Sequence, residues 1–293
     1  MNKWLAGFVL AATFATGAFA APPGATVVAD GLGFPEGTIL ANKVLYFVDY
    51  QASTVNKLDE SSHAVLKKLP GCGANGLVVV GGNLWVACYD SGVIERISAD
   101  GSRLGSIDHS RDGGSFHHPN DLVANRRGDV YFTASGDLPG SGKVFFVPKS
   151  GDIAQEVASG INNANGIALS PDEKTLYVGE SGADRVLDYQ IGGDGTLHSA
   201  HTFAQLDSLA PPPSVGRHTP DGIRVGPDGS IYIALFNGGG SWILNSKGAL
   251  VKTLDVPGEH HSNLAISNDG RVIYVTSISG SSGRIYRLSP LPN

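Results

Sequence analysis

A single arrangement of apolar and polar positions recurs along the chain. In each copy a polar residue at the second position opens a short apolar run, which turns at Gly, Asn or Asp and is followed by a second apolar run such as "LYFV" or "IYIA". Short apolar runs separated by such turn residues predict β-hairpins. The six copies read PEGTILANKVLYFVD, ANGLVVVGGNLWVACYD, PNDLVANRRGDVYFTAS, ANGIALSPDEKTLYVGES, PDGIRVGPDGSIYIALF and HSNLAISNDGRVIYVTS.

The polar residues that open the six copies follow a nearly regular spacing. They are Glu36, Asn75, Asn120, Asn165, Asp221 and Ser262, at intervals of 39, 45, 45, 56 and 41 residues. Further strand-like runs, such as GVIERISAD and GKVFFVPKS, follow the hairpins, and the longest interval contains the proline-rich loop LAPPPSVGRHT. A period in the forties with several short strands per unit is typical of a β-propeller. We therefore predict an all-β fold, a six-bladed β-propeller with four-stranded antiparallel blades. A β-sandwich would leave the six near-equal repeats unexplained.

This repeat geometry brings the opening residues together. The first strand of every blade lines the central channel and all six run in the same direction, so the residues that begin them meet at one mouth. Two carboxylates gathered there would repel each other, and a cation would remove that conflict. Carboxylate, amide and hydroxyl oxygens suit Ca²⁺ best, then Mg²⁺ or Mn²⁺, and Zn²⁺ less because no His or Cys opens a copy. The alternative is that these residues only cap strand ends and bond to neighbouring backbone.

The first twenty residues have the features of a secretory signal peptide. Lys3 gives a positive start, Trp4 to Phe14 is apolar, and Ala18-Phe19-Ala20 matches the small residues before a cleavage site. The apolar run is too short for a good membrane anchor. We expect residues 1–20 to be removed, residues 21–293 to form one propeller domain, and the protein to be exported, either periplasmic or secreted.

The net charge indicates which partners the protein can have, and its two cysteines indicate a possible disulfide. Without Lys3 the chain has 20 basic and 27 acidic residues, a net charge of 20 − 27 = −7. This mild acidity argues against nucleic acid or an anionic membrane as partner, and we expect a monomer that acts on a small molecule. Cys72 and Cys88 can form a disulfide in an oxidising compartment, or remain as two buried thiols.

The repeats also resemble a known family. The segments GFPEG, HPNDLV, NANGIALSPDEKTLYV, TPDGIRVGPDGSIYIALFNGG and HSNLAIS, in this order and spacing, resemble the senescence marker protein / gluconolactonase / luciferin-regenerating enzyme family from about Gly31 to about Tyr286. The resemblance implies one divalent cation at the centre of the propeller, held by Glu36, Asn165 and Asp221. It places Asn120 beside the metal and in contact with substrate, and it makes Asp221 a candidate general base.

The implied activity is metal-dependent hydrolysis of a lactone, that is, a cyclic ester. The cation would polarise the carbonyl, and water would attack, either deprotonated by Asp221 or activated on the metal. Asn120 and Asn75 would orient the ring, and His118 and Ser262 would contact substrate. His118 occupies a position where gluconolactonases of the animal type have an arginine that reads sugar hydroxyls, so the resemblance does not extend to sugar recognition.

Other functions remain open at this point. The propeller could bind a ligand or partner without catalysis, with a structural metal, or it could be a lyase that acts on a cyclic ester. The sequence has no G-x-S-x-G elbow of a serine hydrolase and no Rossmann or Walker loop. We expect His117 and His261 to lie in solvent-exposed loops, although His260 and His261 precede the sixth opening strand, so that His261 also points toward the mouth.

Overall fold

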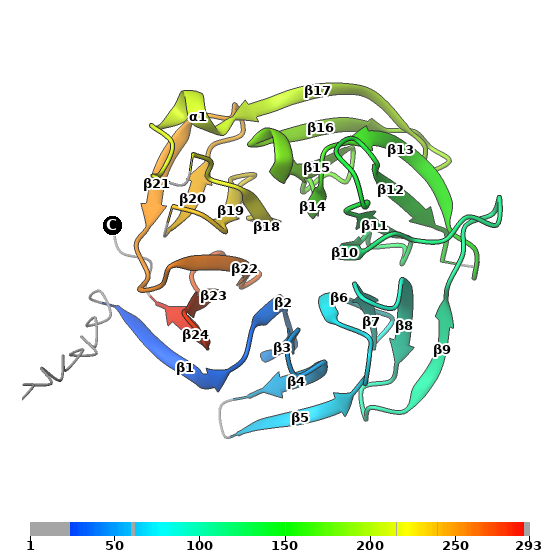
Figure 1. Cartoon of the computed structure of the whole chain (residues 1–293), viewed down its shortest axis with the longest axis horizontal. Coiled ribbons are helices and arrows are strands. Elements are labelled where there is room, and N and C mark those ends of the chain that lie inside the picture. Colours follow the sequence, from blue (N-terminus) through cyan, green and yellow to red (C-terminus); the bar gives the residue numbers. More distant parts are fainter. Residues whose placement is uncertain (1–23, 60–61, 150, 215, 239, 290–293) are drawn as a thin grey trace, which may run out of the picture.

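The chain forms a ring of six blades around a central channel (Figure 1). The structure is a computed structural model that describes residues 24–59, 62–149, 151–214, 216–238 and 240–289, so the predicted signal peptide lies outside the described residues. Each blade is a four-stranded sheet in which neighbouring strands are antiparallel. The predicted six-bladed β-propeller is confirmed.

Within each blade the strands follow one another from the channel to the rim. Blade one contains β2 (Pro35–Ala41), β3 (Val44–Asp49), β4 (Thr54–Leu58) and β5 (His63–Lys68). Blade two contains β6 (Ala74–Val80), β7 (Asn83–Cys88), β8 (Val93–Ile97) and β9 (Arg103–Ile107). Blade three contains β10 (Pro119–Ala124), β11 (Val130–Ala134), β12 (Gly142–Val147) and β13 (Gln155–Ile161). Blade four contains β14 (Ala164–Leu169), β15 (Thr175–Glu180), β16 (Arg185–Ile191) and β17 (Leu197–Gln205). Blade five contains β18 (Pro220–Val225), β19 (Ile231–Leu235), β20 (Gly240–Leu244) and β21 (Leu250–Leu254).

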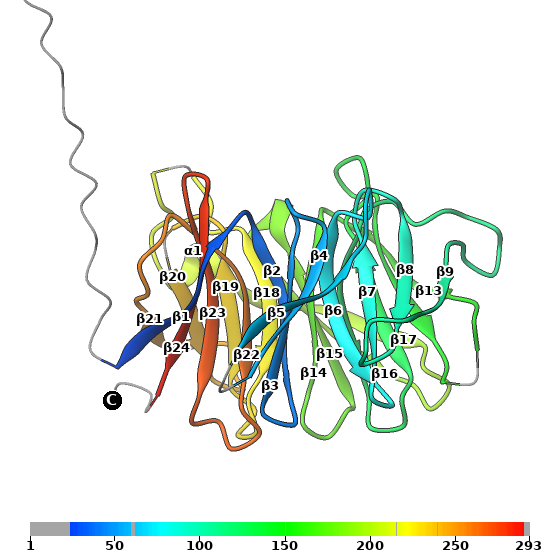
Figure 2. The same ribbon diagram turned by 90° about the horizontal axis from the view of Figure 1, so that it is seen from below.

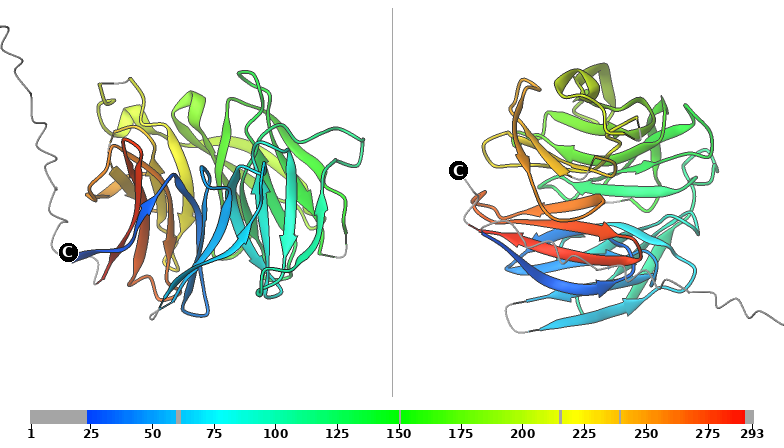
Figure 3. Two further views of the ribbon diagram at one scale, coloured as in Figure 1. Left: turned by 60° about the horizontal axis from the view of Figure 1, so that its bottom comes forward. Right: turned by 60° about the vertical axis from the view of Figure 1, so that its left-hand side comes forward.

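The sixth blade joins the two ends of the described chain. It consists of β22 (His260–Ile266), β23 (Ile273–Ser279), β24 (Ser282–Leu288) and, as its outer strand, β1 (Ala25–Leu32). The strands β1 and β24 are antiparallel, with Ala25 opposite Leu288, and they lie side by side in Figures 2 and 3. This pairing closes the ring, because the first described strand completes the blade that the last three strands begin.

The hydrophobic core lies between neighbouring blades. Six clusters of buried apolar residues are found in the described part of the chain, and each is built mainly from two adjacent blades. The second strand of every blade supplies one fully buried residue at the same register, namely Phe47, Val86, Phe132, Val178, Ile233 and Val275. The apolar residues thus hold the blades together, while buried polar side chains lie where the inner strands begin.

Helices contribute little to this architecture. The short helices η1 (Ser181–Ala183) and α1 (Leu206–Leu209) lie in connections between strands. In the described residues, no helix has both the length and the apolar character needed to cross a membrane.

Glycines let the inner strands approach one another at the mouth. In each inner strand the register shifts near the opening residue, and four of the six units place a glycine directly after that residue. A Cβ on Gly166 would lie 2.1 Å from the backbone oxygen of Asp221 in the next blade, and one on Gly76 would lie 2.3 Å from that of Asn120. Backbone contacts this close need glycine, and they draw the opening residues inward.

Candidate active site

The opening residues lie where the six inner strands begin, at one mouth of the channel. Glu36, Asn75, Asn120 and Asp221 are buried, with 4, 8, 6 and 6% of their surface exposed. Asn165 is half-buried. The side chain of Asn75 reaches the next blade, where Nδ2 donates to the backbone oxygen of Asn120 at 3.3 Å. The sequence prediction that these residues gather agrees with this placement.

Burial and mutual repulsion act on the two carboxyl groups. Burial, followed by the charges of Asp221 and Asp121, raises the pKa of Glu36 well above its ordinary value. Burial, followed by the charge of Asp121, does the same to the pKa of Asp221, opposed by a hydrogen bond from Asn165. Without a cation, the site therefore favours the protonated form of these carboxyl groups, whereas a bound cation would favour the ionised form.

One amide oxygen at the site has no partner. Asn165 Oδ1 is buried and accepts no hydrogen bond from the residues that the structure describes, while the Asn165 side chain bonds to Asp221. A buried polar atom without a partner costs free energy on the order of 1–3 kcal/mol. An amide oxygen and a carboxylate oxygen placed side by side fit a divalent cation, which would accept electron density from both. Asn120 is held in place by a hydrogen bond from Nδ2 to Ser135 Oγ at 3.2 Å.

A second layer of polar side chains, absent from the sequence prediction, lies next to the first. Asp121 and Asn263 follow the opening residues of blades three and six, at the position where the other four units have glycine. Asn263 Oδ1 accepts hydrogen bonds from the backbone nitrogen and hydroxyl of Thr38, at 3.4 and 3.2 Å, and its side chain also bonds to Glu36. Aligning the six repeats would have shown both departures from glycine.

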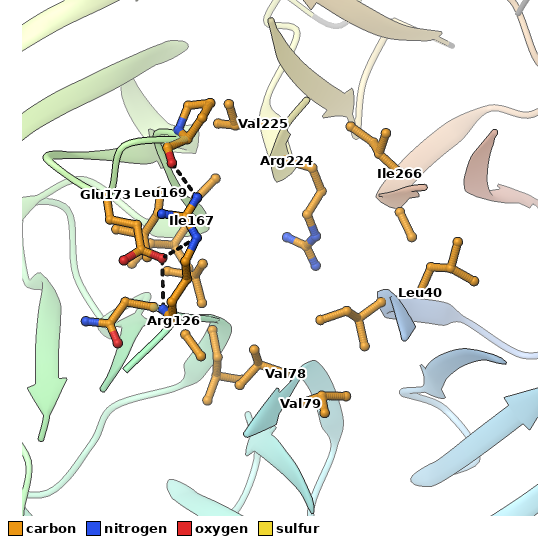
Figure 4. Close-up of a pocket in the computed structure, with 18 of the residues that line it drawn as sticks. Leu40, Val78, Val79, Arg126, Ile167, Leu169, Glu173, Arg224, Val225 and Ile266 are labelled. Atoms are coloured by element: carbon orange, nitrogen blue, oxygen red, sulfur yellow. Dashed lines mark hydrogen bonds and ion pairs between the residues drawn. The ribbon is translucent and has the colours of Figure 1, made fainter. Parts of the chain in front are cut away.

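Asp121 is paired with an arginine that enters from the opposite end of the channel. Arg224 Nη1 lies 2.8 Å from Asp121 Oδ2 and 2.7 Å from the backbone oxygen of Ile223, and Nη2 donates to the backbone oxygen of Thr38 at 3.0 Å. Figure 4 shows the guanidinium in the middle of a cavity of about 480 Å³ lined largely by apolar side chains, including Leu40, Val78 and Ile167.

The charges around the channel leave an excess that matches a divalent cation. With all groups ionised, Glu36, Asp121 and Asp221 contribute three negative charges and Arg224 one positive charge, which leaves −3 + 1 = −2. Across the described residues, no three His, Cys, Asp or Glu side chains gather into a metal site by themselves. A cation here would therefore need amide oxygens as well, a donor set that favours Ca²⁺.

Two residues differ from the sequence expectations. Ser262 is fully buried, and its hydroxyl bonds to the backbone oxygen of Pro35 at 2.6 Å and to Thr276 Oγ1 at 2.7 Å. It links blade six to blade one instead of facing substrate as predicted, because the register turns it into the interface between these blades. His261 is also fully buried, between Ser241 Oγ and the backbone oxygen of Val256, and not in an exposed loop as expected. Burial lowers the pKa of His261 to about 4.

His118 lies at the rim of the mouth. Its side chain is 36% exposed, with Nδ1 3.1 Å from the backbone oxygen of Tyr89 and Nε2 3.0 Å from Asp137. His117 bonds to the same carboxylate at 2.6 Å and is 59% exposed, as expected for a loop residue. His118 is thus held at the rim, two residues before Asn120, by contacts to Tyr89 and Asp137.

A disulfide braces the same region of blade two. Cys72 and Cys88 are bonded, 16 residues apart in the sequence. Cys72 lies just before Asn75, and Cys88 ends β7 just before Tyr89. The bond therefore fixes both the opening residue of this blade and the start of the loop beside it.

Curated relatives include two staphylococcal lactonases. Lactonase drp35 of Staphylococcus saprophyticus is 30% identical over 193 residues, which cover 62% of this chain and 56% of that protein. Lactonase drp35 of Staphylococcus haemolyticus is 28% identical over 158 residues, which cover 52% and 46%. The chain thus spans about half the length of the curated relatives it matches.

Solved structures share the fold at lower identity. A gluconolactonase from Xanthomonas campestris has a TM-score of 0.76 at 24% identity, covering 92% of this chain and 89% of that one. The calcium-binding protein regucalcin from Agrobacterium tumefaciens has a TM-score of 0.70 at 17% identity, covering 88% and 90%.

The family comparison covers most of the propeller. Residues 34–279 match the model described as the SMP-30/Gluconolactonase/LRE-like region. This range contains all six opening residues, the disulfide and the residues at the rim of the mouth. The chain belongs to the SMP-30/gluconolactonase/LRE-like family.

Proposed function

We propose that this protein is an exported hydrolase that opens a lactone with the help of a divalent cation. The observation that carries the proposal is the meeting of two buried carboxylates, Glu36 and Asp221, with the unpartnered amide oxygen of Asn165. The names of the curated relatives, which are lactonases, support the reaction class. The calcium-binding regucalcin among the solved structures supports the cation.

The residues that would hold the cation are Glu36, Asn165 and Asp221, with Asn120 beside them. Their oxygens favour Ca²⁺, while Mg²⁺, Mn²⁺ and Zn²⁺ are the other candidates. When bound, the cation would polarise the ester carbonyl and stabilise the negative charge that develops on its oxygen.

The side chains around the cation have two further roles, proton transfer and orientation of the lactone. Asp221, which is buried at the mouth of the channel, acts as the general base and takes the proton from the attacking water. Asn75 and Asn120 orient the lactone, because hydrogen bonds from their own Nδ2 atoms to the protein hold both amides in place. His118, at the rim, contacts substituents of the ring.

Export is part of this proposal and rests on separate features. Residues 1–20 have the composition of a signal peptide, and the bond between Cys72 and Cys88 is of a kind that persists in oxidising compartments. A periplasmic or secreted location is consistent with both.

The deciding experiment adds metals back to the metal-stripped protein. Hydrolysis of a small panel of lactones is measured without metal and with Ca²⁺, Mg²⁺, Mn²⁺ or Zn²⁺. We expect at least one cation to restore hydrolysis. If none does on any lactone, the enzyme assignment fails in favour of a binding propeller, and a product without added water would indicate a lyase.

Asp221→Asn tests the proposed base. This variant should lose kcat by a factor on the order of 10² to 10⁴, as expected for the loss of a general base. The matched control is Asp207→Asn, which removes an exposed carboxylate on α1 away from the channel. Circular dichroism should show the same fold for both variants, and retained activity in Asp221→Asn would remove its role as base.

A further inference from the structure

Six aromatic rings form a continuous arc around the mouth of the channel, here called the ring arc. Its members, in order of contact, are His118, Tyr89, Tyr50, Phe34, Phe236 and His260. The centroid distances between successive rings are 4.3, 6.2, 5.9, 6.1 and 4.3 Å. Five contacts in a row make one connected wall instead of isolated surface rings.

The propeller repeat explains why these rings meet. Phe34, His118 and His260 lie two residues before the opening residues of blades one, three and six. Tyr50, Tyr89 and Phe236 directly follow the second strands of blades one, two and five. Both positions lie at the same mouth in every blade, so five of the six blades contribute a ring to the wall.

The ring arc is available to a ligand and is connected to the candidate active site. All six rings are half-buried, which leaves part of each exposed. The hydroxyl of Tyr89 bonds to the side chain of Ser135, the same residue that fixes Asn120. A molecule that rests on Tyr89 would therefore lie next to Asn120 and the carboxylates beneath it.

Blade four, in contrast, has a polar gap. The two positions that carry rings elsewhere are Asn163 and Ser181 in this blade. A cavity of about 210 Å³, here called the blade-four cavity, lies between Asn163 and the loop that follows β11 of blade three, and it is lined by Tyr89, Ser135, Gly136, Asp137, Leu138, Pro139, Asn162 and Asn163. Five blades thus place at least one ring at the mouth, whereas blade four places none there.

We propose that the ring arc binds the face of an aromatic or unsaturated ring carried by the lactone, and that the blade-four cavity takes a polar substituent. This proposal rests on the proposed function, because it names the substrate class of the same site. A polyhydroxylated lactone needs a hydrogen-bonding partner for each hydroxyl it buries, and ring faces do not supply them. Aromatic walls favour flat apolar ligands through stacked and edge contacts.

The test compares three six-membered lactones that differ only in their ring substituents. They are an unsubstituted δ-lactone, a benzo-fused δ-lactone and a polyhydroxylated δ-lactone. We expect kcat/KM to be highest for the benzo-fused compound. In Phe236→Leu, the ratio of kcat/KM between the benzo-fused and unsubstituted compounds should fall about tenfold, which corresponds to about 1.4 kcal/mol. Phe203→Leu, which removes a half-buried ring of β17 remote from the mouth, should leave that ratio as in the wild type.

A binding measurement keeps the two proposals separable. Chroman, a benzo-fused cyclic ether without the ester carbonyl, should bind the metal-loaded protein more tightly than tetrahydropyran does, and more weakly after Phe236→Leu. If chroman binds in this way but no lactone is hydrolysed, the ring arc stands and the proposed reaction fails. If lactones are hydrolysed without preference and chroman does not bind, the reaction stands and the ring arc is overturned. Absence of both overturns both.

Discussion

Because Glu36 is a buried carboxylate, Glu36→Gln should raise the free energy of unfolding of the metal-free protein and lower that of the metal-loaded protein. In the metal-free protein, burial and the charges of Asp221 and Asp121 raise the pKa of Glu36 well above its ordinary value. The folded state then keeps a proton that the unfolded chain has already lost. Unfolding releases that proton, so the free energy of unfolding falls as pH rises from about 4.3, the ordinary glutamate pKa, toward the raised folded pKa.

The size of this pH dependence is set by the one proton that Glu36 releases on unfolding. Within that pH range the contribution of Glu36 falls by about 1.4 kcal/mol per pH unit. For each pH unit within that range the shift in Tm is on the order of 2–3 °C for a domain of this size. The glutamine variant lacks this contribution and should become more stable than the wild type as pH rises.

The assay is urea unfolding of both proteins after metal removal, at several pH values between 5 and 7.5. His261, whose pKa is lowered to about 4 by burial, adds the opposite slope between pH 4 and about 6.5, its ordinary value. Because both proteins contain His261, its contribution cancels, and the difference between them reports Glu36 together with its interaction with Asp221. A difference in unfolding free energy that does not change with pH would refute the reasoning.

Added Ca²⁺ should reverse the order of stability. A cation that binds only the folded state stabilises it by about 2.7 kcal/mol at a hundred times its Kd. Glu36→Gln removes a charged ligand and weakens this binding, so the wild type should become the more stable of the two. If Ca²⁺ and the other candidate cations leave both proteins unchanged, the opening residues do not form a cation site.

Three further predictions concern the surroundings of the site. Arg224→Met leaves Asp121 buried without its partner and should lower the free energy of unfolding by about 3–5 kcal/mol in urea, and a loss under 1 kcal/mol would show that the pair is dispensable. Replacing both Cys72 and Cys88 by alanine should cost about 3 kcal/mol in the same assay, as expected for a closed loop of this length, and unchanged stability would contradict it. Gly166→Ala places a Cβ against the backbone of Asp221 and should weaken Ca²⁺ binding measured by calorimetry, while Gly193→Ala, in open space, should not.

The sequence predicted the features that depend on the repeat. The blade number follows from the spacing of Glu36, Asn75, Asn120, Asn165, Asp221 and Ser262, because each opens one unit. That the first five of these lie at one mouth follows from the common direction of the inner strands. These conclusions need only local patterns and the symmetry of the fold.

The features that the sequence did not predict depend on contacts between distant segments. The strand β1 has no copy of the repeat, so its pairing with β24 could not be read from spacing. Ser262 resembles the other opening residues, but its hydroxyl is taken up by Pro35, 227 residues away in the sequence. Asp121 and Arg224 are 103 residues apart and form a pair only across the closed channel. Each of these contacts requires the ring to be complete.

The repeat makes six equivalent positions, and the chain uses them unequally. The carboxylates come from blades one and five, Glu36 and Asp221, on the side of the mouth where the ring arc runs. Asn165, whose Oδ1 has no hydrogen-bond partner among the described residues, comes from blade four, which has no ring at the mouth. In a lactone bound as we propose, the ester group would point toward Glu36 and Asp221, and the apolar face would pack against the ring arc. These two contacts together would fix its orientation. The repeat alone does not require this asymmetry. Because of it, the site would bind its substrate in one orientation, with one face and one end distinguished from the other.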